Sequence, residues 1–378
     1  MVFSGTGPIT LGGSVLLFEQ AEIQVLHLCA WCKNLPVSSC RNIPADILDT
    51  LAQLKLIRLS RNGLSYRCTP DGFAFLQAAQ IPCRQDKDYR SSGDKLQRRL
   101  QTAEVASFFW RYGADVFAQN PPSETRENIF LPAFALRRQQ HANILGGAKL
   151  TGFYYTGESV FIPYFIDADN NGIFPEVEQR TFRADMFLQG RKPHILYTGD
   201  GDLCRLVDTV SYKKERSSKA TTAYYIDAME KFHCPVAIVP MTEDGMRQLR
   251  ILLVPDYRQR LIKNILGKNY LAPASPHTDG RNQTEDFIIG IDCNISRFNH
   301  AMRSKRRTNI FILPFQAEAV QELVAGSKVS CYVLNIEQTE QFLGLPQELP
   351  VIDRTPYRTE KGGYVDVPFI RKNKKAGR

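Results

Sequence analysis

The order of the elements predicted between residues 13 and 80 constrains the fold more than any other feature of the chain. Apolar residues recur at helical spacing in 13–33, which predicts a first helix. After a short segment, Pro44 opens a second helix with one apolar face, since proline suits a first helical position. The alternating residues that follow flank Asn62-Gly63, and this dipeptide strongly favours a two-residue hairpin turn.

A third helix is predicted from about Gly72 to Ala79, with Thr69 or Asp71 as its cap. Helix, short segment, helix, hairpin and helix is an order compatible with a winged helix-turn-helix. In that fold the second long helix usually enters the major groove of DNA, and the hairpin can contact the backbone. We therefore predict a winged helix-turn-helix over residues 1–83.

Within this fold, some residues are expected to read bases and others to contact the DNA backbone. Base reading is predicted for Thr50 and Gln53. Backbone contacts are predicted for Arg41, Arg58 and Arg61, and Lys55 is a further predicted DNA-binding residue. Asp46 and Asp49 lie on the same predicted helix, and their charges oppose an approach to phosphate. The winged helix therefore has a second interpretation, as a surface for a protein partner or for a homodimer.

The formal net charge of +9 makes a polyanion such as DNA a plausible partner. Clusters of basic residues can neutralise phosphates in a salt-sensitive, sequence-independent way, although a charge run is more often only a solvated surface. Three further clusters are Lys213, Lys214, Arg216 and Lys219; Arg303, Lys305, Arg306 and Arg307; and Arg371, Lys372, Lys374, Lys375 and Arg378. We expect double-stranded DNA as the partner.

The rest of the chain divides into three predicted parts. Residues 84–129 hold a polar linker and a helix at about 96–113. Residues 130–345 alternate between strand and helix patterns, which predicts a mixed α/β sheet with some parallel pairing. Its later strands are expected at 236–240, 287–293, 308–315 and 328–336. Residues 346–378 read as a basic tail, and the predicted fold class is α+β or mixed α/β.

Residues 167–178 (DADNNGIFPEVE) match the calcium-loop pattern at every fixed position. A calcium loop of the EF-hand type needs a helix on each side, whereas the residues before Asp167 are β-branched and aromatic and favour a strand. Asp, Asn and Gly also favour a turn. We favour a hairpin turn between strands at 158–167 and 172–182, and a calcium site and a catalytic acid cluster stay open.

The catalytic interpretation is a nuclease of the PD-(D/E)xK class, a domain of the restriction-endonuclease type. Such enzymes place an Asp near one strand and E-x-K on the next, and the carboxylates hold Mg²⁺. Asp167 and Glu178 would hold the metal here, with Glu176 as a further catalytic acid. Arg180 stands where lysine is usual, and arginine stays protonated, so it transfers protons poorly. A DNA-binding domain without nuclease activity is the alternative.

Other motifs mainly argue against particular kinds of site and classes of protein. Cys29 and Cys32 form a C-x-x-C, but no second pair completes a zinc site, so we expect buried thiols. No P-loop motif occurs, which argues against an ATPase. An odd number of scattered cysteines, no long apolar run and no basic segment at the N-terminus predict a cytoplasmic protein that does not enter a membrane.

The order of a winged helix, a basic linker helix and a nuclease-like domain resembles the replication-relaxation family. Its members are DNA-associated proteins of plasmids and integrative elements in Gram-positive bacteria. The resemblance lies mainly in residues 15–80, especially ILDTLAQLKLIRLSRNGLSYRCTPDGFAFL, and more loosely in the D…ExR pattern of 167–180. It implies a role in replication, DNA relaxation or transfer of a mobile element. An active Mg²⁺-dependent endonuclease and a non-enzymatic regulator or adaptor are the alternatives.

Overall fold

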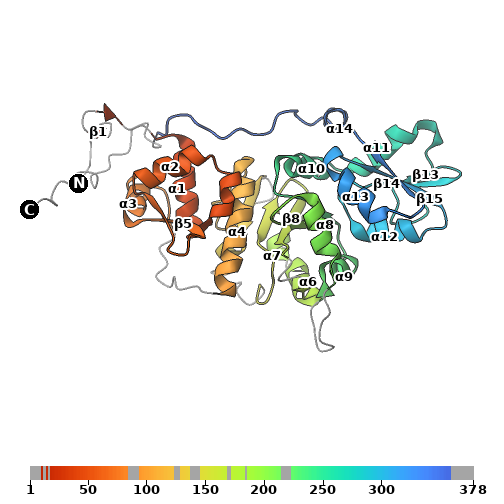
Figure 1. Ribbon diagram of the computed structural model, residues 1–378, viewed down its shortest axis with the longest axis horizontal. Helices are drawn as coiled ribbons and strands as arrows, with labels where there is room; N and C mark the ends of the chain where they lie inside the picture. Colours follow the sequence, from red (N-terminus) through yellow and green to blue (C-terminus); the bar gives the residue numbers. More distant parts are fainter. Residues whose placement is uncertain are drawn as a thin grey trace, which may run out of the picture. The chain divides into compact units, whose positions relative to one another are not determined.

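A computed structural model of the chain describes residues 10–11, 14–15, 18–83, 93–122, 128–136, 145–167, 172–183, 185–213 and 223–358. The fold mixes helices with several separate sheets, in agreement with the predicted class (Figure 1). Two compact units result, one of residues 1–117 with 350–378 and one of residues 118–349. The chain therefore crosses between the units twice, and this division differs from the predicted boundaries at 83, 129 and 345.

The first unit packs helices around a small antiparallel sheet (Figure 1). The helices are α1 (Gln20–Cys32), η1 (Val37–Arg41), α2 (Ala45–Gln53), α3 (Pro70–Ala78) and α4 (Asp94–Arg111). The sheet has the order β3-β5-β4, from β3 (Leu35–Pro36), β4 (Ile57–Leu59) and β5 (Ser65–Cys68). A separate pair joins β1 (Thr10–Leu11) to β2 (Ser14–Val15). Between residues 18 and 80 the elements come in the predicted order.

Local sequence explains the boundaries of these elements. The Thr69 hydroxyl accepts the Gly72 amide at 3.0 Å and caps α3, as one of the two predicted caps would. Gly63 has a φ of 70°, which glycine adopts without steric cost, so the turn forms where Asn62-Gly63 predicts it. The Asn62 side chain accepts the Leu64 amide at 3.2 Å and closes that turn.

Residues 350–358 return to the first unit and complete the N-terminus of α1. The Gln20 amide donates to the Thr355 carbonyl at 2.8 Å, and the Ala21 amide donates to the Asp353 carbonyl at 2.9 Å. The first amides of a helix have no partner within it, so these two bonds satisfy groups that would otherwise need water. Part of the predicted tail is thus an ordered segment of the first unit.

A buried histidine couples the stability of the first unit to pH. His27 on α1 is 8% exposed, its Nε2 lies 3.0 Å from the Pro82 carbonyl oxygen, and its ring stacks on Phe117. Burial lowers the pKa of His27 from 6.5 to about 4. Between these two values the unfolded chain binds a proton at this position that the folded chain does not.

We expect the free energy of unfolding of this unit to fall as the pH falls from 7 to 4, by about 3 kcal/mol from His27. Both tryptophans, Trp31 and Trp110, lie in the first unit, so their fluorescence during denaturant unfolding reports on it. His27→Gln keeps a donor for the Pro82 carbonyl but does not titrate, and it should lose most of this pH dependence. Equal pH dependence in His27→Gln and wild type would contradict the prediction.

The second unit contains a five-stranded sheet of order β12-β10-β8-β7-β6. Strands β6 (Ile129–Pro132), β7 (Gly152–Tyr155) and β8 (Ser159–Phe165) form an antiparallel meander, and β10 (Lys192–Thr198) and β12 (Val236–Ile238) continue it parallel to β8. The remaining elements of this region are α5 (Ala133–Leu136), α6 (Pro175–Arg183), α7 (Asp185–Leu188), α8 (Leu203–Ser211), α9 (Tyr225–Lys231) and the pair β9 (Gly172–Ile173) with β11 (Ala223–Tyr224). The predicted pairing around Thr156-Gly157 is confirmed.

A second, four-stranded sheet has the order β13-β14-β15-β16, and its last three strands are parallel. Its strands are β13 (Gly280–Arg281), β14 (Glu285–Ile289), β15 (Arg307–Ile312) and β16 (Val329–Val333). The helices of this region are α10 (Glu243–Leu253), α11 (Tyr257–Leu266), η3 (Gly267–Asn269), α12 (Ile295–Arg303), η4 (Pro314–Gln316), α13 (Ala317–Val324) and α14 (Ile336–Leu343). The predicted alternation and parallel pairing are confirmed, although the strands divide between two sheets.

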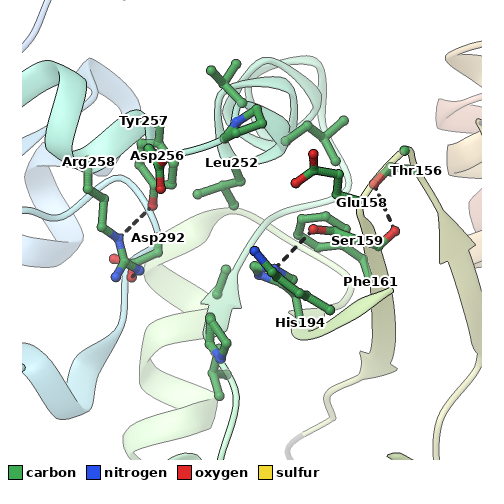
Figure 2. A pocket seen from close by; sticks show the side chains of 18 of the residues that line it. Thr156, Glu158, Ser159, Phe161, His194, Leu252, Asp256, Tyr257, Arg258 and Asp292 are labelled. Atoms are coloured by element: carbon green, nitrogen blue, oxygen red, sulfur yellow. Dashed lines mark hydrogen bonds and ion pairs between the residues drawn. The ribbon is translucent and has the colours of Figure 1, made fainter. Parts of the chain in front are cut away.

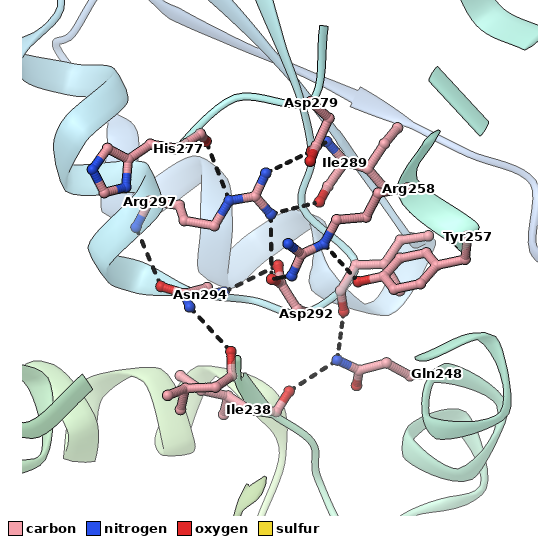
Figure 3. Close-up of polar contacts among 12 residues, drawn as sticks. Ile238, Gln248, Tyr257, Arg258, His277, Asp279, Ile289, Asp292, Asn294 and Arg297 are labelled. Atoms are coloured by element: carbon pink, nitrogen blue, oxygen red, sulfur yellow. Dashed lines mark hydrogen bonds and ion pairs between the residues drawn. The ribbon is translucent and has the colours of Figure 1, made fainter. Parts of the chain in front are cut away.

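Buried polar groups join the two sheets of the second unit (Figure 3). The Ile238 amide at the end of β12 donates to the Asp292 carbonyl at 2.9 Å. The Gln248 side-chain amide donates to the Ile238 and Ile291 carbonyls at 2.9 and 2.6 Å. Ile238 ends β12 and Ile291 follows the end of β14, so Gln248 links the ends of the two strands and supplies each carbonyl with a donor.

The predicted strand over 172–182 is wrong. Only Gly172–Ile173 is a strand, and α6 begins at Pro175. Proline suits the first turn of a helix. The negative charges of Glu176 and Glu178 in that turn interact favourably with the positive end of the helix dipole. These signals outweigh the β-branched and aromatic residues nearby. Within the described part of the chain, no helix is long and apolar enough to cross a membrane.

Candidate functional site

The hairpin β4–β5 and the end of α2 carry exposed cationic side chains. Lys55 lies two residues after the end of α2, Arg58 lies on β4, and Arg61 lies in the turn. All three side chains are exposed, and within the described ranges none of them forms an ion pair. The hairpin therefore presents positive charge that no neighbouring carboxylate in the described structure neutralises.

Arg67 adds a fourth cation that the sequence prediction missed. The register of the hairpin places Arg58 directly opposite Arg67. The buried Asn34 side chain accepts a hydrogen bond from Arg67 Nε at 2.8 Å and holds the guanidinium in place. The signal was present in the sequence, because the position of the hairpin turn around Asn62-Gly63 determines which residues of the two strands face each other.

The residues on η1 and α2 that were predicted to contact DNA differ in their exposure and in the partners they already have. Gln53 is exposed and Thr50 is partly buried on α2. Arg41 donates to Glu104 at 2.7 Å and to the Ser38 carbonyl at 3.0 Å, so it ties η1 to α4. Because Glu104 is buried, this ion pair has a structural role that competes with a contact to DNA.

The basic clusters of the second unit are partly neutralised. Lys213 pairs with Asp227 at 2.6 Å, Arg306 with Asp286 at 3.1 Å, and Arg307 with Glu285 at 3.5 Å. Arg303 and Lys305 are exposed and form no ion pair with any described residue. The remaining cluster residues lie outside the described ranges: Lys214, Arg216, Lys219 and the cations of 371–378.

The predicted catalytic hairpin is not formed, because α6 replaces its second strand. Asp167 follows β8, where an EF-hand would need a helix, and Asp169 and Asn171 lie outside the described residues. Glu176 and Arg180 are exposed on α6, whereas Glu178 is fully buried. Two residues apart on a helix, Glu176 and Glu178 point to different sides, since a turn takes 3.6 residues.

Glu178 has a structural environment. Its Oε1 accepts the Lys149 amide at 2.7 Å, and its Oε2 accepts the Tyr164 hydroxyl at 2.7 Å. Burial, followed by the neighbouring Glu178 carboxylate, raises the pKa of Tyr164 well above its ordinary value. Within the described ranges, no group of three or more His, Cys, Asp or Glu side chains is placed to hold a metal. Metal binding by Asp167 and Glu178 stays a prediction, and the position of Glu178 gives it no support.

A cavity of about 720 Å³ opens in the second unit, at the amino ends of β8, β10 and β12 (Figure 2). Ser159 Oγ lies 3.3 Å from His194 Nε2, and the His194 ring stacks on Phe161. Burial lowers the pKa of His194 to about 4, so its imidazole is neutral at pH 7. A serine nucleophile also needs a group that orients the base, and no described carboxylate hydrogen-bonds His194.

One wall of this cavity is a buried charge network (Figure 3). Arg297 on α12 pairs with Asp279 at 2.5 Å and with Asp292 at 3.3 Å, and it also donates to the Ile289 carbonyl at 3.2 Å. Arg258 on α11 pairs with Asp292 from the other side. The network connects α11, α12 and the end of β14, which indicates a structural role.

Two smaller features are a pair of thiols and a helix cap. Cys29 and Cys32 are buried within α1, as expected for core residues. Asp202, in the Gly- and Asp-rich segment after β10, accepts the Arg205 amide at 2.9 Å and caps α8.

Comparison of the chain with protein-family models, with curated proteins and with solved structures gave no match.

Proposed function

We propose that the protein binds duplex DNA through its first unit, which acts as a winged helix-turn-helix. In this proposal α2 is the recognition helix, with Thr50 and Gln53 toward the bases, and the hairpin β4–β5 is the wing. Support comes from the order of α1, η1, α2, hairpin and α3, and from the sheet order β3-β5-β4.

The pair Arg58 and Arg67 carries the proposal. The register places the two residues directly opposite each other, on the same face of the hairpin. A phosphate could therefore bind to both guanidinium groups, because guanidinium matches phosphate in charge and hydrogen-bond geometry. Lys55 precedes the pair along the chain and Arg61 lies in the turn between its two members, and both add to the positive surface.

Beyond DNA binding, we propose a more specific role in replication, relaxation or transfer of a mobile element, and this proposal concerns the second unit. Its three-stranded antiparallel meander, helical crossover and parallel fourth strand are compatible with a domain of the restriction-endonuclease type. A fold alone does not establish an activity. We therefore propose DNA binding without cleavage, in which the second unit is a nuclease-like domain that does not cut.

A salt series tests DNA binding. The purified full chain is titrated against labelled random duplex DNA at several salt concentrations, with and without Mg²⁺. We expect affinity that falls linearly with log salt, with a slope of about −0.9 for each phosphate contacted. No binding at low salt would overturn the proposal and favour a protein partner or homodimer. Shortening of the label only with Mg²⁺ would instead favour the endonuclease.

A further inference from the structure

The C-terminal segment places a cation on the acidic face of α2. Arg354 donates to both carboxylate oxygens of Asp46, at 2.7 and 3.1 Å, and also lies 3.4 Å from a Glu19 carboxylate oxygen. Backbone hydrogen bonds from α1 to Asp353 and Thr355, on either side of Arg354, fix the segment there. The contact joins residues 308 positions apart.

An acidic residue at position 46 stabilises α2 itself, independently of any binding partner of the protein. It lies in the first turn of α2, where a negative charge interacts favourably with the helix dipole. The same carboxylate is exposed on the face that carries Thr50 and Gln53, so it opposes an approach of α2 to phosphate. The hydrogen bonds from Arg354 lower the pKa of Asp46, and the carboxylate therefore stays charged near neutral pH.

We propose that Arg354 is a positioning residue of the DNA-binding surface, which neutralises Asp46 so that α2 can approach the phosphate backbone. This inference rests on the proposed function. It makes the C-terminal segment part of the DNA-binding unit. It also means that Arg354 neutralises Asp46, one of the two acids of α2 that oppose the approach of a polyanionic partner.

The test measures duplex DNA affinity at low salt for wild type, Arg354→Ala, Arg354→Lys, and Arg354→Ala combined with Asp46→Asn. Arg358→Ala is the matched control, because Arg358 is an exposed cation of the same segment without an ion pair to any described residue. Tryptophan fluorescence during unfolding checks that each variant keeps the first unit folded.

We expect Arg354→Ala to weaken binding on the order of threefold to tenfold, since a carboxylate within several ångströms of phosphate becomes uncompensated. Adding Asp46→Asn should restore wild-type affinity, Arg354→Lys should retain most of it, and Arg358→Ala should weaken binding less. An equal loss in Arg354→Ala and Arg358→Ala would overturn the inference, because net charge alone would then explain it. Failure of Asp46→Asn to restore binding would also overturn it. Absence of binding by wild type would instead reject the proposed function itself.

Discussion

Replacing Lys55, Arg58 and Arg61 together by alanine is expected to lower the affinity for duplex DNA by about two to three orders of magnitude at 0.1 M salt. Each cation that neutralises a phosphate contributes about 0.9 to the slope of log affinity against log salt, so three contribute about 2.7. The slope of the variant should therefore be shallower by about this amount. Titration of both proteins with the same labelled duplex at four or five salt concentrations measures both effects.

The matched control removes the same charge elsewhere. Lys231, Lys268 and Lys328 are exposed cations of the second unit that form no ion pair with any described residue. Their joint replacement by alanine changes the net charge by the same three units. If the binding surface is the hairpin, the control should keep nearly the wild-type slope. Equal losses in the two triple variants would show that net charge, and not the hairpin, drives binding.

Replacing Arg297 by alanine is expected to destabilise the second unit by about 3–5 kcal/mol. The substitution leaves the buried Asp279 and Asp292 with one cation fewer, and breaking a buried ion pair by removing one partner carries a cost of this size. Both tryptophans lie in the first unit, so calorimetry or hydrogen exchange of the β14 amides is the suitable measurement.

Arg303→Ala provides the control for that experiment. Arg303 lies on the same helix, α12, but is exposed and forms no ion pair within the described ranges. Its replacement should change stability by no more than about 0.5 kcal/mol, as is usual for surface positions. A small effect of Arg297→Ala, close to that of Arg303→Ala, would mean that water enters and solvates the two carboxylates. The network would then not be what holds α11 and α12 to the end of β14.

Where nearby residues decide the structure, the sequence was sufficient. The turn at Asn62-Gly63, the cap at Thr69 and the pair β7–β8 each depend on residues that are close along the chain. The same holds for the alternation of strand and helix from 236 to 336, where apolar runs and helical spacing mark each element. The register that places Arg58 opposite Arg67 also follows from the turn, although Arg67 was not among the predicted DNA-binding residues.

The segment 167–178 shows where local patterns were insufficient. Its acids matched the calcium-loop pattern and, more loosely, a nuclease hairpin, because both patterns specify residue types and spacing but not burial. The tertiary structure placed Glu178 inside the second unit, where the Lys149 amide and the Tyr164 hydroxyl occupy its two oxygens. A carboxylate becomes a ligand or a structural acceptor according to its neighbours, and these neighbours come from distant parts of the chain.

The sequence by itself determined the local elements, the mixed fold class and the positive charge that makes DNA the proposed partner. Only the tertiary structure decided which charges remain available. It neutralised Asp46 with Arg354, committed Arg41 to Glu104 and left Lys55, Arg58 and Arg61 exposed. The physical reason is that an ion pair depends on distance in space. A contact across 308 residues leaves no periodicity, turn or spacing in the sequence from which it could be predicted.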